Sequence, residues 1–132
     1  MIKFGYTIFY VESVENTLEF YKNSFGINIK FLHESKDYGE LNTGETTLAF
    51  ASLEMAKLNF VIDKIETNSI KKQFTTEIAL VTDNVESTLE KALLNKATLV
   101  KEPEKKSWGQ TVAYIRDIDN NLIELCTPIS SD

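Results

Sequence analysis

A six-residue segment occurs twice in the chain, and this repeat constrains the fold more than any other sequence feature. Residues 14–19 read Val-Glu-Asn-Thr-Leu-Glu and residues 85–90 read Val-Glu-Ser-Thr-Leu-Glu, so five of six positions are identical at an offset of 71. Each copy follows a strand-like segment, 6–11 or 77–82, and begins a segment whose apolar residues have helical spacing. Because the flanking patterns repeat in the same order, the chain is predicted to contain two copies of one structural unit.

The two predicted helices carry matching signals at their ends. Ser13 and Asn84 occupy the N-cap positions, where a side-chain oxygen accepts a hydrogen bond from the first helical turn. Gly26 suits the left-handed residue that often ends a helix. We therefore expect one helix to run from Val14 to Phe25 and the other to begin at Val85.

Three more strands are expected after each helix, separated by short turns. They fall at 27–32, 38–42 and 46–51 in the first half, and at 98–101, 110–116 and 121–126 in the second half. The element order in each half is βαβββ, which predicts an α+β fold. We expect a single domain over 1–132, with module 1 at about 1–52, a connector at about 53–74 that includes a helix near 53–60, and module 2 at about 75–132.

Composition excludes several classes of protein. The formal net charge of -6 disfavours nucleic acid as a partner, since phosphate binding needs a basic face. No apolar run approaches the roughly 20 residues that span a bilayer, so no membrane association is expected. A single cysteine, Cys126, forms no internal disulfide and suits a reducing compartment, which predicts a cytoplasmic protein.

Four stretches carry a resemblance to a known family. They are the Phe20-Tyr21 pair followed by Phe25-Gly26, the segment 77–85, Glu102-Pro103 with Trp108-Gly109-Gln110, and the hairpin 116–125, Arg-Asp-Ile-Asp-Asn-Asn-Leu-Ile-Glu-Leu. Together they resemble the glyoxalase/bleomycin-resistance/dioxygenase (vicinal oxygen chelate, VOC) superfamily over nearly the whole chain. Ile118 and Asn120 replace the usual Pro and Gly of that hairpin, and Asn tolerates the left-handed conformation that Gly often supplies.

The resemblance implies that the two βαβββ modules form a curved, mixed eight-stranded sheet around a cup for a small molecule, and that the protein is a homodimer. Metal-using members place ligands at positions that fall on Tyr6, Ala49, Glu77 and Glu124. Ala49 offers no ligand atom, and the phenol of Tyr6 must lose a proton to ligate well. Because two carboxylates are fewer than the three protein ligands of most catalytic sites, we expect no metal and no other cofactor.

Period-two alternation assigns side chains to the cup. If Tyr6 points inward, Tyr10 does too, while Phe9 and Val11 meet the helix. The residues expected to bind the ligand are Tyr6, Tyr10, Ala49, Trp108, Gln110, Val112, Tyr114 and Arg116, with Arg116 at the mouth. Glu77 and Glu124 should also point inward, where one carboxylate pKa should rise or a cation should compensate.

Several of these residues have two interpretations. Glu77 or Glu124 could act as a general base next to a carbonyl, with Tyr6 or Tyr114 donating to the oxyanion, although carboxylates bonded only to tyrosines or water are the favoured interpretation. Trp108 could stack on a planar ligand or serve as a packing anchor. Gln110 could bind a ligand or the backbone across the sheet. Arg116 could bind an anion, although a salt bridge to Asp117 or Asp119 is the more ordinary arrangement.

Four functions follow from the resemblance and the expected cup. The favoured one is a metal-free protein of the bleomycin-resistance type that binds an aromatic or cationic, antibiotic-like molecule. The second is a lyase or isomerase of the lactoylglutathione lyase type that abstracts a proton next to a carbonyl. The third is a metal-dependent dioxygenase, disfavoured by Ala49 and Tyr6. The fourth is a non-catalytic interaction module. The sequence does not decide whether the protein is an enzyme.

Overall fold

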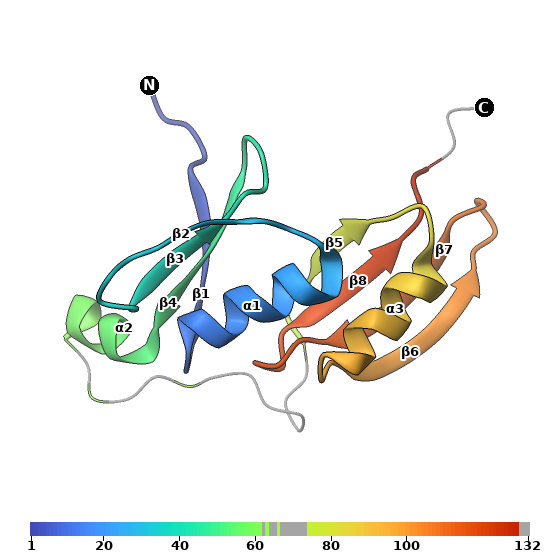
Figure 1. Cartoon of the computed structure of the whole chain (residues 1–132). Coiled ribbons are helices and arrows are strands. Elements are labelled where there is room, and N and C mark those ends of the chain that lie inside the picture. The colour runs from blue at the N-terminus through green and yellow to red at the C-terminus, as the bar shows by residue number, and fades with distance from the viewer. Residues whose placement is uncertain (62, 64–65, 67–73, 130–132) are drawn as a thin grey trace. The chain divides into compact units, whose positions relative to one another are not determined.

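The computed structural model describes residues 1–61, 63, 66 and 74–129. In chain order its elements are β1 (Tyr6–Val11), α1 (Val14–Phe25), β2 (Ile29–Leu32), β3 (Tyr38–Leu41), β4 (Thr47–Ser52), α2 (Leu53–Phe60), β5 (Ile78–Val81), α3 (Val85–Leu94), β6 (Thr98–Lys105), β7 (Thr111–Arg116) and β8 (Leu122–Cys126) (Figure 1). The chain divides into two compact units, an N-terminal unit, Met1–Thr67, and a C-terminal unit, Asn68–Asp132. The predicted α+β class and the βαβββ order of both halves are confirmed.

The N-terminal unit is a four-stranded mixed sheet with the order β1-β4-β3-β2. β1 runs parallel to β4, and the other neighbours are antiparallel. The helix α1 packs on one face, where the ring of Phe50 lies 5.2 Å from that of Tyr21 on α1 and 6.3 Å from that of Phe9. Val11 is also buried, so β1 turns Phe9 and Val11 toward the helix as alternation predicted. The opposite face of the sheet is called the open face below.

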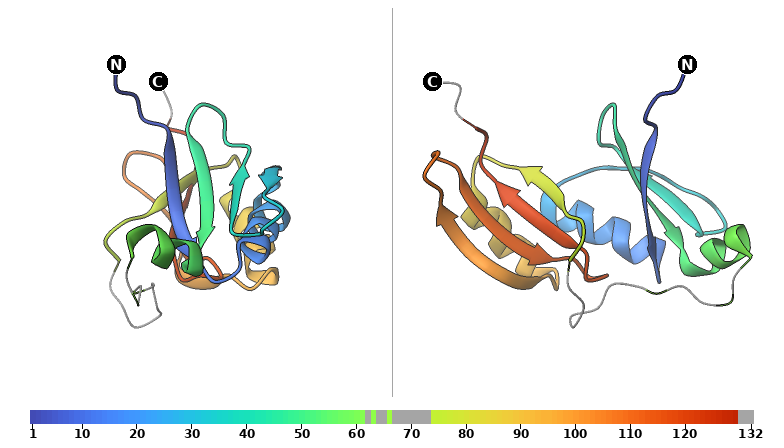
Figure 2. Two further views of the ribbon diagram at one scale, coloured as in Figure 1. Left: turned by 90° about the vertical axis from the view of Figure 1, so that its left-hand side faces the viewer. Right: turned by 180° about the vertical axis from the view of Figure 1, so that it is seen from behind.

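The C-terminal unit repeats this plan with the order β5-β8-β7-β6. β5 runs parallel to β8, and α3 packs against β6, β7 and β8, on one side of the sheet (Figure 2). Four side chains of the helix-facing layer are fully buried: Ala113, Ile115, Ile123 and Leu125. These residues alternate with residues of the opposite, open face of this sheet, among them Tyr114 and Glu124, so a single register fixes both the core and the candidate site.

The predicted helix ends are confirmed. Ser13 Oγ accepts a hydrogen bond from the Asn16 amide at 3.2 Å, and Asn84 Oδ1 accepts one from the Ser87 amide at 3.0 Å. Gly26 ends α1 with φ 70°. Asn120 has φ 66° in the β7–β8 turn, so it adopts the left-handed conformation that was expected of it in place of Gly.

Several strand ends differ from the predicted boundaries, most by one or two residues, and two of the differences matter for the site and the sheet edge. β6 extends to Lys105, four residues beyond the predicted end, and it contains Pro103. β6 is an edge strand with register shifts between Leu99 and Lys101 and between Lys101 and Glu104, and both conditions let a strand accommodate a proline. β5 begins at Ile78, which leaves Glu77 just before the strand.

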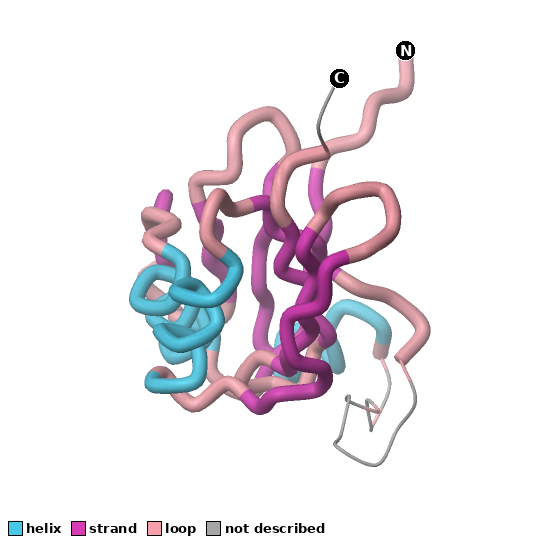
Figure 3. The backbone as a smooth tube through the Cα atoms, turned by 90° about the vertical axis from the view of Figure 1, so that its right-hand side faces the viewer, coloured by secondary structure: helices cyan, strands magenta, loops and turns pink. Residues whose placement is uncertain are grey.

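The helix predicted within the connector, α2, packs against β1 and β4 of the N-terminal unit. The rings of Phe60 on α2 and Tyr10 on β1 meet edge to face, 5.6 Å apart. The rest of the expected connector falls largely on residues 67–73, which lie outside the described part of the chain. Helices and strands account for most of the described backbone (Figure 3). None of the helices in this part of the chain has the length and apolar character needed to cross a lipid bilayer.

Candidate functional site

Glu124 lies on the open face of the C-terminal sheet. It occupies the centre of β8 between the fully buried Ile123 and Leu125, so its half-buried side chain points away from α3. β7 places Tyr114 directly opposite Glu124, and the Tyr114 hydroxyl donates a hydrogen bond of 2.9 Å to Glu124 Oε1. The cross-strand pair therefore orients the carboxylate, as expected for a glutamate bonded to a tyrosine.

Glu77 interacts electrostatically with this pair. Partial desolvation raises the pKa of Glu77 above its ordinary value, and the negative charge of Glu124 raises it further. The hydrogen bond to Glu124, burial and the two negative charges raise the pKa of Tyr114 to about 12. Glu77, Tyr114 and Glu124 form one coupled group, called the acidic cluster below. Among the described residues, no lysine or arginine forms an ion pair with either carboxylate.

A cavity of about 370 Å³ lies beside the acidic cluster, lined by Phe74, Thr75, Thr76, Glu77 and Leu122. Leu122 and Glu124 are two residues apart on β8, so both side chains face the same side of the sheet. The cavity thus has one carboxylate in its wall and a second nearby, together with two hydroxyl groups, an aromatic ring and an aliphatic side chain. This mixture is typical of sites for small organic molecules.

Arg116 and Gln110 bind groups of their own chain. Arg116 is only 7% exposed, and its guanidinium lies 4.0 Å from the centre of the Phe74 ring, where the cation contacts the aromatic face. Its Nη1 also donates to the Asn120 carbonyl at 3.3 Å. Gln110 Nε2 donates to the Thr127 carbonyl at 2.7 Å, which is the backbone contact across the sheet considered above. Arg116 was expected at the mouth of the cup, and in the structure the ring of Phe74 packs against its guanidinium.

The other residues expected to bind the ligand differ in how far their side chains are exposed to solvent. Trp108 is 60% exposed near the β6–β7 turn, and its Nε1 donates to Gln110 Oε1 at 2.7 Å. Tyr6 is 58% exposed on β1. Ala49 is fully buried and Val112 is 4% exposed, so neither presents surface to a ligand. Each lies in an interior strand of its sheet, Ala49 in β4 and Val112 in β7.

Cys126 follows the last core residue of β8 and is buried. Burial raises the pKa of its thiol, and the nearby Glu124 carboxylate raises it further. The thiol therefore stays protonated at neutral pH and is a poor nucleophile.

The side chains at the four family positions do not fit a divalent metal. Ala49 has no donor atom, and Tyr6 would have to ionise. The described residues contain no group of three or more His, Cys, Asp or Glu side chains placed to hold an ion. No catalytic step is therefore assigned to a metal, and the metal-free state remains a prediction.

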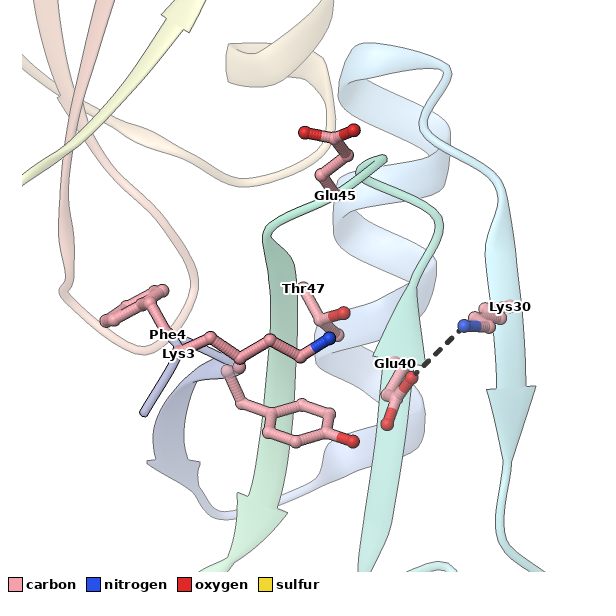
Figure 4. Close-up of a pocket in the computed structure, with 8 residues that line it drawn as sticks. Lys3, Phe4, Lys30, Glu40, Glu45 and Thr47 are labelled. Carbon is pink, nitrogen blue, oxygen red and sulfur yellow. Dashed lines mark ion pairs between the residues drawn. The ribbon is translucent and has the colours of Figure 1, made fainter. Parts of the chain in front are cut away.

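A second polar group on the open face of the N-terminal sheet was not predicted. Tyr38 Oη donates to Glu40 Oε2 at 2.8 Å, and Lys30 Nζ lies 3.8 Å from Glu40 Oε1. Figure 4 shows Glu40 and Lys30 in the wall of a cavity of about 660 Å³. The alternation of Tyr38 and Glu40 on one strand was the available signal, because it places both side chains on the same face.

The fold consists of two βαβββ units, each covered on one face by its helix. The family model of the Glyoxalase-like domain matches residues 4–130, so the chain belongs to that family. The resemblance to the glyoxalase/bleomycin-resistance/dioxygenase superfamily is thereby confirmed. An uncharacterized protein of Bacillus subtilis (strain 168), YraH, is 28% identical over 117 residues, covering 87% of this chain and 90% of that protein.

Solved structures share the fold. A glyoxalase/bleomycin resistance protein/dioxygenase family enzyme from Burkholderia phytofirmans PsJN has a TM-score of 0.76 at 22% identity, covering 92% of this chain and 95% of that one. A glyoxalase-related enzyme from Fulvimarina pelagi has a TM-score of 0.78 at 14% identity, covering 100% of this chain and 95% of that one. At these identities the likeness concerns the fold alone, so the function is argued from the side chains.

Proposed function

We propose that the C-terminal unit binds a small aromatic or antibiotic-like organic cation at the acidic cluster, without a metal ion. The observation that carries this proposal is the coupling of Glu77 to Glu124 in the absence of an ion pair to either carboxylate among the described residues. Two like charges near each other repel, and a bound cation removes that repulsion. Binding is thus stronger when both carboxylates are ionised.

The surroundings of the acidic cluster suit a cation with an apolar body. The cavity of about 370 Å³ has the size of a site for a small ligand. Tyr114 supplies an aromatic ring next to Glu124, and Phe74, which has Arg116 against its ring, lines the cavity. Aromatic faces attract organic cations, whereas an inorganic ion would need more oxygen donors than these residues provide.

A panel of aromatic amines and their uncharged analogues tests this proposal by thermal shift and calorimetry. We expect the amines to bind, and we expect Glu124→Gln or Glu77→Gln to weaken binding about tenfold, equivalent to about 1.4 kcal/mol. Glu90→Gln, on an exposed position of α3, is the matched control and should leave affinity unchanged. Equal binding of the uncharged analogues, or affinities that ignore both glutamine variants, would contradict the proposal.

The raised pKa of Glu77 favours a second candidate, a lyase or isomerase. In this reaction a carboxylate, Glu77 or Glu124, removes a proton from the carbon next to a carbonyl, and the oxygen of the resulting enolate accepts a hydrogen bond from Tyr114. Tyr114 would have to turn its hydroxyl from Glu124 to that oxygen. Mass spectrometry separates the candidates, because a binder returns its ligand unchanged whereas an enzyme forms a product that Glu77→Gln or Glu124→Gln reduces.

The homodimer implied by the resemblance also belongs to this proposal. Sedimentation velocity should give a mass about twice the 15.0 kDa of the chain. A monomer at micromolar concentration would contradict the expected homodimer.

A further inference from the structure

We propose that Ser35 and His33, in the turn between β2 and β3, form a nucleophile–base pair that reacts with activated esters. In this pair Ser35 Oγ is the nucleophile and His33 Nδ1 is the base. The inference goes beyond the proposed function. It uses residues of the N-terminal unit only and does not depend on the acidic cluster.

Two hydrogen bonds to one ring nitrogen fix the tautomer of His33. The Ser35 amide lies 3.1 Å from Nδ1 and can only donate, so Nδ1 carries no proton. Ser35 Oγ lies 2.8 Å from the same nitrogen, so its hydroxyl must be the donor of that bond as well. The serine proton thus already points at the nitrogen that would accept it.

The Ser35 oxygen keeps a lone pair for reaction. One lone pair accepts a hydrogen bond from the Asp37 amide at 3.3 Å, and the other has no partner among the described residues. Ser35 and His33 are both exposed, so a dissolved acyl donor can reach the oxygen. The Asp37 amide also stabilises the negative charge that develops on Oγ as its proton leaves.

Hydrogen bonds and an ion pair fix the turn that carries the pair. The His33 amide donates to the Tyr38 carbonyl at 2.9 Å, and the Lys36 amide donates to the His33 carbonyl at 2.8 Å. The Lys36 ammonium lies 3.1 Å from the carboxylate of Glu15 on α1. Because these contacts hold the backbone around Ser35 and His33, the two side chains need little reorganisation before they react.

Asp37 is not a third member of this pair. Its Oδ1 accepts a hydrogen bond of 2.7 Å from the hydroxyl of Ser52, the N-cap of α2, and no carboxylate of the described residues bonds to the His33 ring. Proton transfer to Nδ1 also costs the bond from the Ser35 amide. The pair therefore suits esters whose leaving group departs easily, such as those of acidic phenols, and not amides.

The reaction has two balanced steps. Ser35 Oγ forms a bond to the ester carbonyl carbon while His33 Nδ1 takes the hydroxyl proton, and the bond from that carbon to the phenol oxygen then breaks. The phenol leaves with the proton, which gives an acyl-serine and a neutral imidazole. Water, whose proton His33 takes in the same way, then attacks the acyl carbon, releases the acid and restores the serine hydroxyl.

The probe 4-nitrophenyl acetate tests the inference on the full-length chain. We expect release of nitrophenolate together with an acetyl group that mass spectrometry of acid-quenched peptides locates on Ser35. Ser35→Ala should abolish this acetylation. His33→Gln should slow it about a hundredfold, because the amide oxygen can accept the same hydrogen bonds but cannot take the proton.

Ser107→Ala is the matched control, since Ser107 is also an exposed serine in a turn between two strands. This variant should react at the rate of the parent, and equal melting temperatures should show that all three variants fold. Two results would overturn the inference. One is acetylation found only on lysines or on the histidine ring, and the other is nitrophenolate release that neither Ser35→Ala nor His33→Gln reduces.

Discussion

Each unit donates one tyrosine hydroxyl to one glutamate on its open face, but the two pairs are built differently. Tyr38 and Glu40 are two residues apart on the same strand, β3. Tyr114 and Glu124 face each other across β7 and β8. In the register of the repeat, Glu40 lies opposite Ala49 whereas Tyr114 lies opposite Glu124. The open faces have therefore diverged in chemistry while the helix-facing layers kept the same apolar plan.

Removing the Tyr114 hydroxyl tests the strength of the cross-strand pair. Tyr114→Phe should lower the free energy of unfolding by about 1 kcal/mol, since it removes a hydrogen bond to a partly buried carboxylate. Urea denaturation measures this change. Tyr10→Phe is the control, because the described residues offer no hydrogen bond to the Tyr10 hydroxyl. Equal losses in both variants would mean that the Tyr114–Glu124 bond does not stabilise the unit.

The raised pKa of Glu77 predicts a pH dependence of stability. A carboxyl whose pKa is higher in the folded state binds its proton more tightly there, so folding loses stability as the pH rises above the ordinary value of 4.5. Glu77→Gln removes this loss. The variant should melt at a slightly higher temperature than the parent at pH 7 and at the same temperature near pH 4.

Thermal denaturation over this pH range, with Glu90→Gln as control, checks the prediction. A Glu77→Gln variant that melts lower than the parent at pH 7 would show that the Glu77 carboxylate stabilises the fold. The pKa of Glu77 would then not be raised in the folded protein.

At the scale of elements, the N-caps of α1 and α3 are the most predictable features of the chain. Ser13→Ala and Asn84→Ala should each cost about 1 kcal/mol of stability, because each leaves an amide of the first turn without its acceptor. Chemical denaturation measures both costs. Ser107→Ala, at an exposed position in the β6–β7 turn, should change nothing. A cost confined to one cap would show that the two units do not depend on their helices in the same way.

The sequence predicted those elements whose signals are local. The bounds of β1, α1 and α2 agree with the predicted ranges. For α1 the reason is plain, because Ser13 and Gly26 mark its two ends. The end of β6 was wrong because Pro103 signals a break, and only the edge position of β6 permits the strand to continue. That position depends on strand order, which local patterns do not specify.

The candidate sites were predictable to the extent that they follow from alternation. Alternation placed Tyr114 and Glu124 on the same face, and their hydrogen bond agrees with it. It could not reveal the contact of Arg116 with Phe74, because Phe74 lies outside every predicted strand. The Lys30–Glu40 pair was missed because it depends on the pairing of β2 with β3, which includes a register shift.

At the scale of the whole molecule, the chain is expected to keep its fold without a metal. The family positions hold a phenol, a methyl group and two carboxylates, which is too poor a donor set for a structural ion. Dialysis against a chelator should therefore leave the melting temperature unchanged, and elemental analysis of the purified protein should find no stoichiometric metal. One equivalent of a divalent metal, or a melting temperature lowered by the chelator, would contradict the proposed function.

The proline in β6 has a consequence for how this protein can associate. Pro103 has no amide hydrogen, and the two register shifts around it interrupt the regular spacing of the backbone groups along that edge strand. A strand from another molecule therefore finds no continuous ladder to join there, so the β6 side of the C-terminal sheet resists growth into a fibre. Pro103, which led to too short a strand in the sequence-based prediction, thus protects the folded protein from strand-by-strand aggregation at that edge.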